Sequence, residues 1–271
     1  MVTLGKKVKI NDIIVEPIKK NATNPDKILG YDIFPDPYSN IFLCAKKRSG
    51  KTSTLFSILK KCAGKDTKIL IFASTVFKDD NYKAIMKYFK SKQIVLIPKT
   101  HFINEGVNEL ENLIKSLEKE NEDSEESEDD EITMLADDLT KFREIKEKKK
   151  ISKLAPEFIF VFDDLSKDLR NKCISALLKK NRHFKCKTII SSQTWSDIDQ
   201  EGRNQIDYCL LFQGHSKEKL ELIHKDLDLS IPFDEFLAIY YNATAEKYHF
   251  LYIDVRECSF RQDFNKLFVI V

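Results

Sequence analysis

The sequence lacks long hydrophobic runs, paired cysteine motifs and an excess of glycine or proline. No stretch approaches the roughly 20 apolar residues that a membrane-spanning helix needs, and the N-terminus (MVTLGKKVKI) has no signal-peptide core. The six cysteines form no tight C-x-x-C pair, which speaks against a disulfide scaffold or a zinc site. With 42% hydrophobic and 32% charged residues, the composition is typical of a globular protein. We therefore expect an intracellular protein in a reducing compartment, not secreted and without a membrane segment.

The near-balance of charge, 45 Lys and Arg against 43 Asp and Glu, conceals two unlike parts. Residues 118–131 (EKENEDSEESEDDE) hold ten acids and one lysine, a net of −9, so the other 257 residues carry +11 within a total of +2. A basic body of this kind is typical of a protein that binds a polyanion, although a lysine-rich solvated surface has the same composition. Because the acidic run cannot bury apolar surface, we expect a mobile insertion at about 106–150.

Short apolar runs alternate with amphipathic stretches along most of the chain. Buried strands are predicted at 41–44, 68–73, 94–97, 158–162, 187–192, 208–212, 248–255 and 267–271. Helices are predicted at 51–62, 82–91, 169–180 and 217–225. This alternation predicts an α/β fold with a mainly parallel central sheet flanked by helices. We expect residues 1–30 to form an arm or edge segment and residues 31–271 to form one domain.

One loop of the predicted fold matches the phosphate-binding loop, with alanine in place of the first glycine. It is Ala45-Lys46-Lys47-Arg48-Ser49-Gly50-Lys51-Thr52, followed by Ser53, and it lies between a predicted strand and a predicted helix, as such a loop must. Its backbone N–H groups would surround the β-phosphate, with the positive end of the helix behind them. Lys51 would reach the β- and γ-phosphates, and the Thr52 hydroxyl would ligate Mg²⁺. The alternative is a basic turn before an ordinary helix.

A pair of carboxylates follows the most apolar predicted strand, Phe158–Phe162, downstream of the loop. Nucleotide hydrolysis on a phosphate-binding loop needs such a group at the end of a neighbouring strand, to hold the water shell of Mg²⁺. Asp163 would orient the metal, and Asp164 would polarise the attacking water as a general base. Capping of the helix that follows a buried strand is the alternative role for either residue.

Two further side chains complete the predicted site. Gln193, just past the strand at 187–192, could touch the γ-phosphate and report its loss, although a glutamine in an exposed turn is common. Hydrolases of this class often need an arginine, supplied by a neighbouring subunit, for charge on the transferring phosphoryl group. Arg203 and Arg182 are the candidates near the predicted catalytic edge, and each could instead be a surface or DNA-contacting arginine.

The motifs AKKRSGKTS, FIFVFDDL, a helix ending in NRHF, TIISSQTW and EGRNQIDYCLLF, in this order, resemble the poxvirus-type DNA-packaging ATPases. These form a viral branch of the FtsK–HerA superfamily in large DNA viruses, virophages and Polinton-like elements. The similarity runs from about residue 31 to the C-terminus and leaves out the acidic insertion. The sequence departs from the family at Ala45, usually Gly, and at Asn181, where the RH motif has Gly. The broader ATPase class prefers Glu at Asp164, although viral members often have Asp-Asp.

The resemblance implies a P-loop NTPase of the ASCE, RecA/FtsK-like type, with ATP and Mg²⁺ as cofactors. Such proteins hydrolyse ATP to drive double-stranded DNA into a capsid, and they work as homo-oligomeric rings. The implied site consists of the nucleotide and metal residues Lys51 and Thr52, the metal and catalytic carboxylates Asp163 and Asp164, the sensor Gln193 and the arginine finger Arg203. The implied partners are double-stranded DNA and capsid or vertex proteins, in the host cytoplasm, a viral factory or the virion.

Two other functions could use the same loop. The first is a nucleotide-binding adaptor that recruits DNA or capsid with little hydrolysis, which the retention of Lys51, Thr52 and both carboxylates disfavours. The second is a P-loop kinase. Kinases of that type usually lack the extra strand, here 69–73, between the phosphate-binding loop and the metal-binding aspartate. The motifs therefore favour an ATPase over both alternatives.

Overall fold

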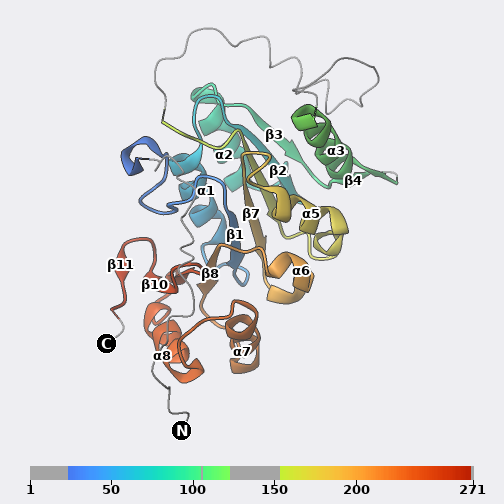
Figure 1. The fold of residues 1–271 in the computed structure, drawn as a ribbon. Coiled ribbons are helices and arrows are strands. Elements are labelled where there is room, and N and C mark those ends of the chain that lie inside the picture. Colours follow the sequence, from blue (N-terminus) through green and yellow to red (C-terminus); the bar gives the residue numbers. More distant parts are fainter. Residues whose placement is uncertain (1–23, 105, 123–152, 270–271) are drawn as a thin grey trace, which may run out of the picture.

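A computed structural model of the chain describes residues 24–104, 106–122 and 153–269. Its centre is a nine-stranded sheet in the order β11-β10-β9-β8-β1-β7-β6-β2-β3, with helices on both faces (Figure 1). The expected N-terminal arm lies outside the described residues up to position 23, as does the acidic run from position 123 onward. Among the described residues, no helix is long and apolar enough to cross a membrane.

Six neighbouring strands of this sheet run parallel, as the alternation of strands and helices predicts. They are β8 (Tyr208–Phe212), β1 (Asn40–Cys44), β7 (Cys186–Ser192), β6 (Phe158–Asp163), β2 (Lys68–Ala73) and β3 (Leu96–Lys99). Every residue of β1, β6, β7 and β8 is buried. Because helices cover both faces of these strands, β1, β6 and β8 have near-continuous apolar sequences instead of an alternating pattern.

Three antiparallel strands extend the sheet beyond β8. They are β9 (Phe250–Asp254), β10 (Ser259–Gln262) and β11 (Lys266–Leu267). The strand predicted at 248–255 corresponds to β9, whereas β10 has no counterpart among the predicted strands. Within the described residues, the strand predicted at 267–271 is reduced to β11. A separate two-stranded hairpin is formed by β4 (Ile103–Asn104) and β5 (Val107–Asn108).

The helices divide between the two faces of the sheet according to the buried cluster that they join. One face carries α1 (Lys51–Cys62) and α2 (Asp80–Ser91). The other carries α3 (Glu109–Glu122), α5 (Lys172–Lys180), α7 (Lys217–Asp226) and α8 (Phe233–Ala243). The remaining helices are the short α6 (Gln200–Arg203) and the 3₁₀ turns η1 (Pro25–Lys27), η3 (Asp168–Arg170) and η4 (Trp195–Asp197).

The first part of the insertion expected at 106–150 forms the helix α3, which packs against the core. Its apolar side chains at positions 110, 113, 114 and 117 are buried in the main core, because a spacing of three and four residues places them on one side of the helix. The carboxylate of Glu118, in the first turn of the acidic run, accepts a hydrogen bond of 2.6 Å from the Lys180 ammonium on α5. The chain up to residue 122 therefore belongs to the packed body, and residues 123–152 lie outside the described part.

The order of the strands determines where the predicted motifs meet. Strand β7 lies between β1 and β6, with Ser192 in register with Cys44 and Ser191 in register with Asp163. The parallel strands therefore end together at one edge of the sheet, which we call the carboxyl edge. They begin at the opposite, amino edge. The phosphate-binding loop, Asp163 and the residues after β7 all follow strand ends at the carboxyl edge.

Candidate active site at the carboxyl edge

The loop that joins β1 to α1, residues 45–50, turns sharply before the helix begins. Arg48 and Gly50 have positive φ angles of 63° and 93°, in the left-handed region that glycine adopts most easily. The Ser49 hydroxyl donates a hydrogen bond of 2.7 Å to the carbonyl of Lys46, which closes the turn. No side chain of the described residues caps the N-terminus of α1. Its first backbone N–H groups are therefore available for an anion, which the positive end of the helix dipole would also attract.

The side chain of Lys51 joins this loop to the two predicted carboxylates. Its Nζ lies 3.0 Å from Oδ1 of Asp163 and 2.7 Å from Oδ2 of Asp164. Burial lowers the pKa of Lys51, but the two carboxylates outweigh burial and hold the pKa above its usual value. The ammonium is therefore charged and lies where the loop and the end of β6 converge. A phosphate bound by the loop would compete with the carboxylates for this cation.

Asp163 is also held by a residue that the sequence did not reveal. The Tyr82 hydroxyl, on α2, donates a hydrogen bond of 2.6 Å to Oδ2 of Asp163, and the tyrosine is only 1% exposed. Burial, together with the nearby Asp163 carboxylate, raises the pKa of Tyr82, so the phenol remains a donor. Oδ1 of Asp163 faces Lys51 and makes no hydrogen bond to the described residues. Tyr82 thus fixes one carboxylate oxygen, and the other faces the Lys51 ammonium.

Asp164 has a strained backbone. Its φ is 52°, and its N–H donates a hydrogen bond of 3.0 Å to the carbonyl of Ser191 at the end of β7. Such a conformation costs a non-glycine residue about 1–3 kcal/mol and persists only where the surroundings impose it. Here it turns the Asp164 carboxylate towards Lys51, while the side chain remains 38% exposed. Asp164 can therefore contact both the buried cation and solvent.

The structure brings Gln193 to the same edge, directly after β7. The N–H of Ala45, the first residue of the phosphate-binding loop, donates a hydrogen bond of 2.9 Å to the carbonyl of the preceding Ser192. Gln193 is half-buried, and its side-chain amide makes no hydrogen bond to the part of the chain that the structure describes. The hydrogen bond between Ala45 and Ser192 joins the two loops, so it would transmit a displacement of Gln193 to the phosphate-binding loop.

His215 is a second residue near the site that the sequence did not reveal. It follows β8, is 6% exposed, and has its Nε2 3.1 Å from the carbonyl oxygen of Cys44, the last residue of β1. A contact with a carbonyl requires a proton on Nε2, and burial lowers the pKa of His215, so the ring is neutral with an unprotonated Nδ1. The Tyr240 hydroxyl accepts from the His215 N–H at 3.2 Å. These contacts fix the start of the phosphate-binding loop.

Arg203 is held by contacts within this chain. Its Nε donates to Oδ2 of Asp226 at 2.8 Å, and its Nη1 donates to the carbonyl of Ile198 at 2.8 Å. The same Asp226 oxygen accepts from the indole N–H of the buried Trp195, and the Arg203 side chain is only 13% exposed. In this conformation Asp226 and the Ile198 carbonyl both engage the guanidinium. A role as an arginine finger would require that it first leave Asp226.

Arg182 does not lie near the catalytic edge, where the sequence predicted it. It precedes β7, and its Nη2 lies 3.5 Å from Asp36 and 3.8 Å from Asp207, which flank the beginnings of β1 and β8. Arg256 pairs with the same two carboxylates, at 3.3 Å and 3.6 Å. Both arginines therefore lie at the amino edge: Arg182 precedes the parallel strand β7, and Arg256 follows the antiparallel strand β9, which ends at that edge.

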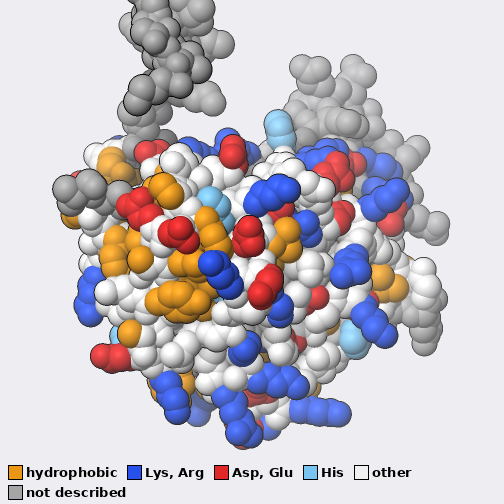
Figure 2. Space-filling view, turned by 90° about the horizontal axis from the view of Figure 1, so that it is seen from below, with side chains coloured by type: hydrophobic (Ala, Val, Ile, Leu, Met, Phe, Trp, Pro, Cys, Tyr) orange, Lys and Arg blue, Asp and Glu red, His pale blue; other side chains and the backbone are white. Residues whose placement is uncertain are grey.

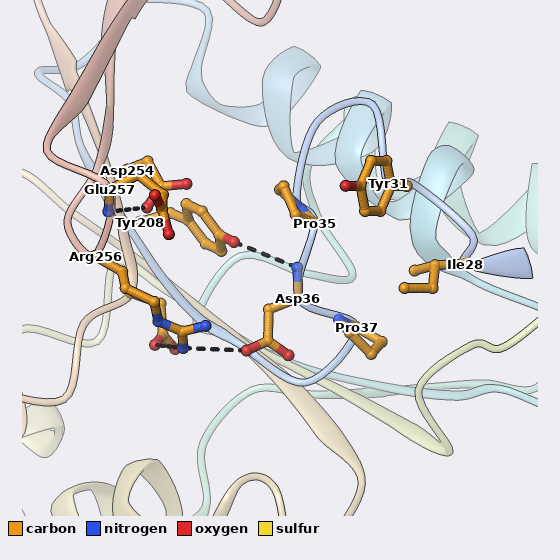
Figure 3. Close-up of a pocket in the computed structure, with 10 residues that line it drawn as sticks. Ile28, Tyr31, Pro35, Asp36, Pro37, Tyr208, Asp254, Arg256 and Glu257 are labelled. Carbon is orange, nitrogen blue, oxygen red and sulfur yellow. Dashed lines mark hydrogen bonds and ion pairs between the residues drawn. The ribbon is translucent and has the colours of Figure 1, made fainter. Parts of the chain in front are cut away.

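A cavity of about 280 Å³ also opens at the amino edge (Figure 3). Its lining includes Asp36, Tyr208, Asp254 and Arg256, and the Asp36 N–H donates to the Tyr208 hydroxyl at 3.4 Å. Burial raises the pKa of both Asp254 and Tyr208. None of the predicted site residues lines this cavity. The predicted site residues at the carboxyl edge and the cavity at the amino edge therefore lie at opposite ends of the parallel strands.

One protein family matches the sequence of this chain. The family of the poxvirus A32 protein matches residues 124–263, about half of the chain. The match includes Asp163, Asp164 and Gln193, whereas the phosphate-binding loop precedes it. It begins within the acidic run, which the resemblance seen in the sequence had left outside. No curated protein matches the chain significantly.

Solved structures of viral packaging proteins have a similar fold. One is the genome packaging NTPase B204 from Sulfolobus turreted icosahedral virus 2 in complex with ATP-gammaS, with a TM-score of 0.53 and 17% identity. Another is B204, the DNA-packaging ATPase from Sulfolobus turreted icosahedral virus, with a TM-score of 0.51 and 18% identity. The alignments cover 84% of this chain and 98% and 97% of those chains. The chain therefore belongs to the poxvirus A32 protein family and has the fold of a P-loop NTPase.

Proposed function

We propose that this protein is an ATP-hydrolysing motor that translocates double-stranded DNA and packages a viral genome into its capsid. The observation that carries the proposal is the position of Lys51, whose ammonium lies within 3.0 Å of Asp163 and 2.7 Å of Asp164 beside an uncapped helix. Membership of the A32 family and the fold shared with B204 support the same function. The order of the strands also supports it, because β7 separates β1 from β6 and carries Gln193 to the site.

The residues at the carboxyl edge suit the triphosphate of ATP. The N–H groups at the start of α1 and the Lys51 ammonium would bind the β- and γ-phosphates, which explains why a loop with two left-handed residues precedes the helix. On binding, the phosphates would replace Asp163 and Asp164 as partners of Lys51. This exchange would release both carboxylates for their roles in hydrolysis.

The donor set also fits Mg²⁺, which prefers a few carboxylate and hydroxyl ligands and retains several waters. Oδ1 of Asp163 is buried and has only the Lys51 ammonium, 3.0 Å away, as a side-chain partner among the described residues, and Thr52 in the first turn of α1 offers a hydroxyl. Asp163 and Thr52 would hold the ion, and Tyr82 would keep Asp163 oriented. When bound, the ion would neutralise charge on the β- and γ-phosphates.

Asp164 is the best-placed general base. Its carboxylate is partly exposed, so it can contact water, and its strained backbone directs it towards Lys51. It would accept a proton from the attacking water while the side-chain amide of Gln193, which makes no hydrogen bond to the described residues, would contact the γ-phosphate or that water. Loss of the γ-phosphate would then displace Gln193. The hydrogen bond between Ser192 and Ala45 would transmit this displacement to the phosphate-binding loop.

The proposed DNA partner is supported by charge. The chain outside residues 118–131 carries a net +11. On the side of the molecule where α7 and α8 lie, Lys and Arg side chains gather along the lower and right margins, and hydrophobic side chains gather left of centre (Figure 2). Cationic side chains of this kind would bind backbone phosphates without reading sequence, so the interaction should weaken steeply with salt. The proposal includes a homo-oligomeric ring and a capsid or vertex partner.

Phosphate release from ATP, measured with and without linear duplex DNA, tests this function. We expect DNA to raise the rate at low salt and the effect to fade as salt increases. A rate that DNA leaves unchanged at low salt would contradict the motor. The matched control is Lys51→Ala, which should lose both the basal and the stimulated rate. If Lys51→Ala turned over ATP like the wild type, the phosphate-binding loop would have no catalytic role.

A further inference from the structure

The turn between α8 and β9 places an exposed aromatic ring against the phosphate-binding loop. Tyr248 is 67% exposed, yet a Cβ built on Gly50 would lie only 3.3 Å from its ring atom Cδ1. The ring therefore packs on the bare backbone of the residue that precedes Lys51. Tyr248 itself has a φ of 72°, a left-handed conformation that is unusual for an aromatic residue and costs energy. A large apolar ring is thus held in solvent, in a strained conformation, beside the proposed triphosphate site.

The position of Tyr248 is fixed by its neighbours in the chain. Nδ1 of His249 lies 2.6 Å from Oδ2 of Asp263, and the N–H of Phe250 donates to the other oxygen of that carboxylate at 3.3 Å. The Asp263 N–H in turn donates to the Phe250 carbonyl at 2.9 Å. These bonds tie the turn to the strands β9 and β10. The backbone that carries the ring is therefore ordered before any ligand arrives, which lowers the cost of binding against the ring.

The order of the strands puts this ring at the opposite end of the site from the catalytic carboxylates. In the sequence β9-β8-β1-β7-β6, Asp163 lies at the end of β6, on one side of β1, and Tyr248 precedes β9, on the other side. A triphosphate along the loop after β1 would have its γ-phosphate near Asp163. Its ribose and base would then extend towards β8 and β9, where Tyr248 lies.

We infer that Tyr248 binds the base of the nucleotide by stacking on its ring. The inference rests on the proposed function, since it requires a nucleoside triphosphate in the phosphate-binding loop. A phenol ring has a flat apolar face, and every base has a matching π-face, so stacking is tolerant of base identity but stronger for larger bases. Tyr248 should therefore favour purine over pyrimidine nucleotides without choosing between adenine and guanine.

The experiment compares ligands with and without a base. Dissociation constants of the wild type and of Tyr248→Ala are measured for ATP and for inorganic tripolyphosphate, each with Mg²⁺. Loss of one stacking contact should weaken ATP binding about tenfold and leave tripolyphosphate binding unchanged. Tyr248→Phe keeps the ring and should bind ATP like the wild type. Tyr248→Asn, a residue that tolerates left-handed backbone, removes the ring with less strain and should resemble Tyr248→Ala.

The matched control is Tyr241→Ala, which removes another exposed tyrosine, on α8, and should leave ATP affinity unchanged. Equal ATP affinity in the wild type and Tyr248→Ala would overturn the inference, and so would an equal loss for tripolyphosphate. A comparison of ATP and GTP with CTP and UTP gives a second readout, because the wild type should prefer the purines and Tyr248→Ala should not. If the wild type bound none of these nucleotides, the proposed function would fail as well, which separates the two outcomes.

Discussion

At the amino edge of the sheet, Asp36 and Asp207 are each paired with Arg182 and Arg256, and Asp207 also accepts a hydrogen bond of 2.8 Å from the Asn40 N–H. At the carboxyl edge, one lysine faces two carboxylates, and no side chain of the described residues caps the start of the helix α1. Two carboxylates thus share two arginines at one edge, whereas two carboxylates share a single lysine at the other. A lysine that lies beside the N-terminus of a helix can exchange its carboxylate partners for a bound phosphate.

Among the substitutions at the two edges, we expect that of Asp164 to change ATP turnover the most. In Asp164→Asn the side chain keeps its size but cannot accept a proton from water. We expect ATP turnover to fall about 10²- to 10⁴-fold, the usual contribution of a general base, while nucleotide binding changes little. Single-turnover hydrolysis and equilibrium binding, measured on the same preparation, separate the two effects. Turnover within a few-fold of the wild type would assign the base to another residue.

The matching substitution at the amino edge, Asp207→Ala, should affect stability and leave the chemistry alone. It removes the acceptor of the Asn40 N–H at the start of the buried β1, so a backbone donor loses its partner. We expect the free energy of unfolding to fall by about 2 kcal/mol. Denaturant titration measures this loss, and turnover per folded molecule should equal that of the wild type. A loss of turnover without a loss of stability would show that Asp207, at the amino edge, contributes to catalysis.

The pH dependence of stability gives an independent view of Asp207. Burial raises the pKa of this carboxyl above its usual value of 3.8, so the folded state binds its proton more tightly than the unfolded state. The stabilising effect of this protonation is fully present below pH 3.8 and is lost as the pH rises through the raised pKa. The stability difference between the wild type and Asp207→Ala should therefore shrink over that range. A difference that does not vary with pH would contradict the raised pKa.

Tyr82 should have a moderate effect, confined to the carboxyl edge. Tyr82→Phe keeps the packing of α2 but removes the hydroxyl that donates to Asp163. We expect about a tenfold loss of turnover and a higher Mg²⁺ requirement, because the carboxylate would lose its fixed orientation. Titration of the rate with Mg²⁺ distinguishes this positioning role from a merely structural one. A lower rate with an unchanged Mg²⁺ requirement would count against it.

The smallest effect should come from Arg256 at the amino edge. Its side chain is 56% exposed, and solvent screens its pairs with Asp36 and Asp207. We expect Arg256→Ala to change the free energy of unfolding by less than about 1 kcal/mol and to leave turnover unchanged. Thermal denaturation and a turnover assay check both statements. A large loss of turnover only in the assembled protein would instead show that Arg256 acts on a neighbouring subunit.

Local patterns predicted the parallel half of the fold well. The helix at 51–62 and the strands at 68–73 and 208–212 coincide with α1, β2 and β8, because buried parallel strands have continuous apolar sequences and α1 has its apolar residues at helical spacing. The helix α8 and the short polar strand β10 were not predicted. A strand such as β10, with one buried residue, depends on its pairing with β9 and has no hydrophobic signal of its own.

The candidate site likewise contains residues that the sequence predicted and residues that it did not. The phosphate-binding loop, Asp163, Asp164 and Gln193 each follow a predicted strand, so the rule that parallel strands end at one edge was enough to bring them together. Tyr82 and Tyr248 reach the site through tertiary packing, which no spacing in the sequence encodes, whereas His215 follows the predicted strand at 208–212 and the same rule could have found it. The side-chain partners of Arg203 and Arg182 were likewise invisible, because they depend on Asp226, Asp36 and Asp207, which are distant in the chain.

The central claim is that ATP is hydrolysed at the carboxyl edge and that the amino edge is structural. The most direct test is the initial rate of phosphate release from ATP with Mg²⁺, measured side by side for the wild type, Lys51→Ala and Asp207→Ala at a temperature where all three are folded. We predict a rate near zero for Lys51→Ala and a wild-type rate per folded molecule for Asp207→Ala. Equal rates for the wild type and Lys51→Ala, or loss of the rate in Asp207→Ala alone, would contradict the account.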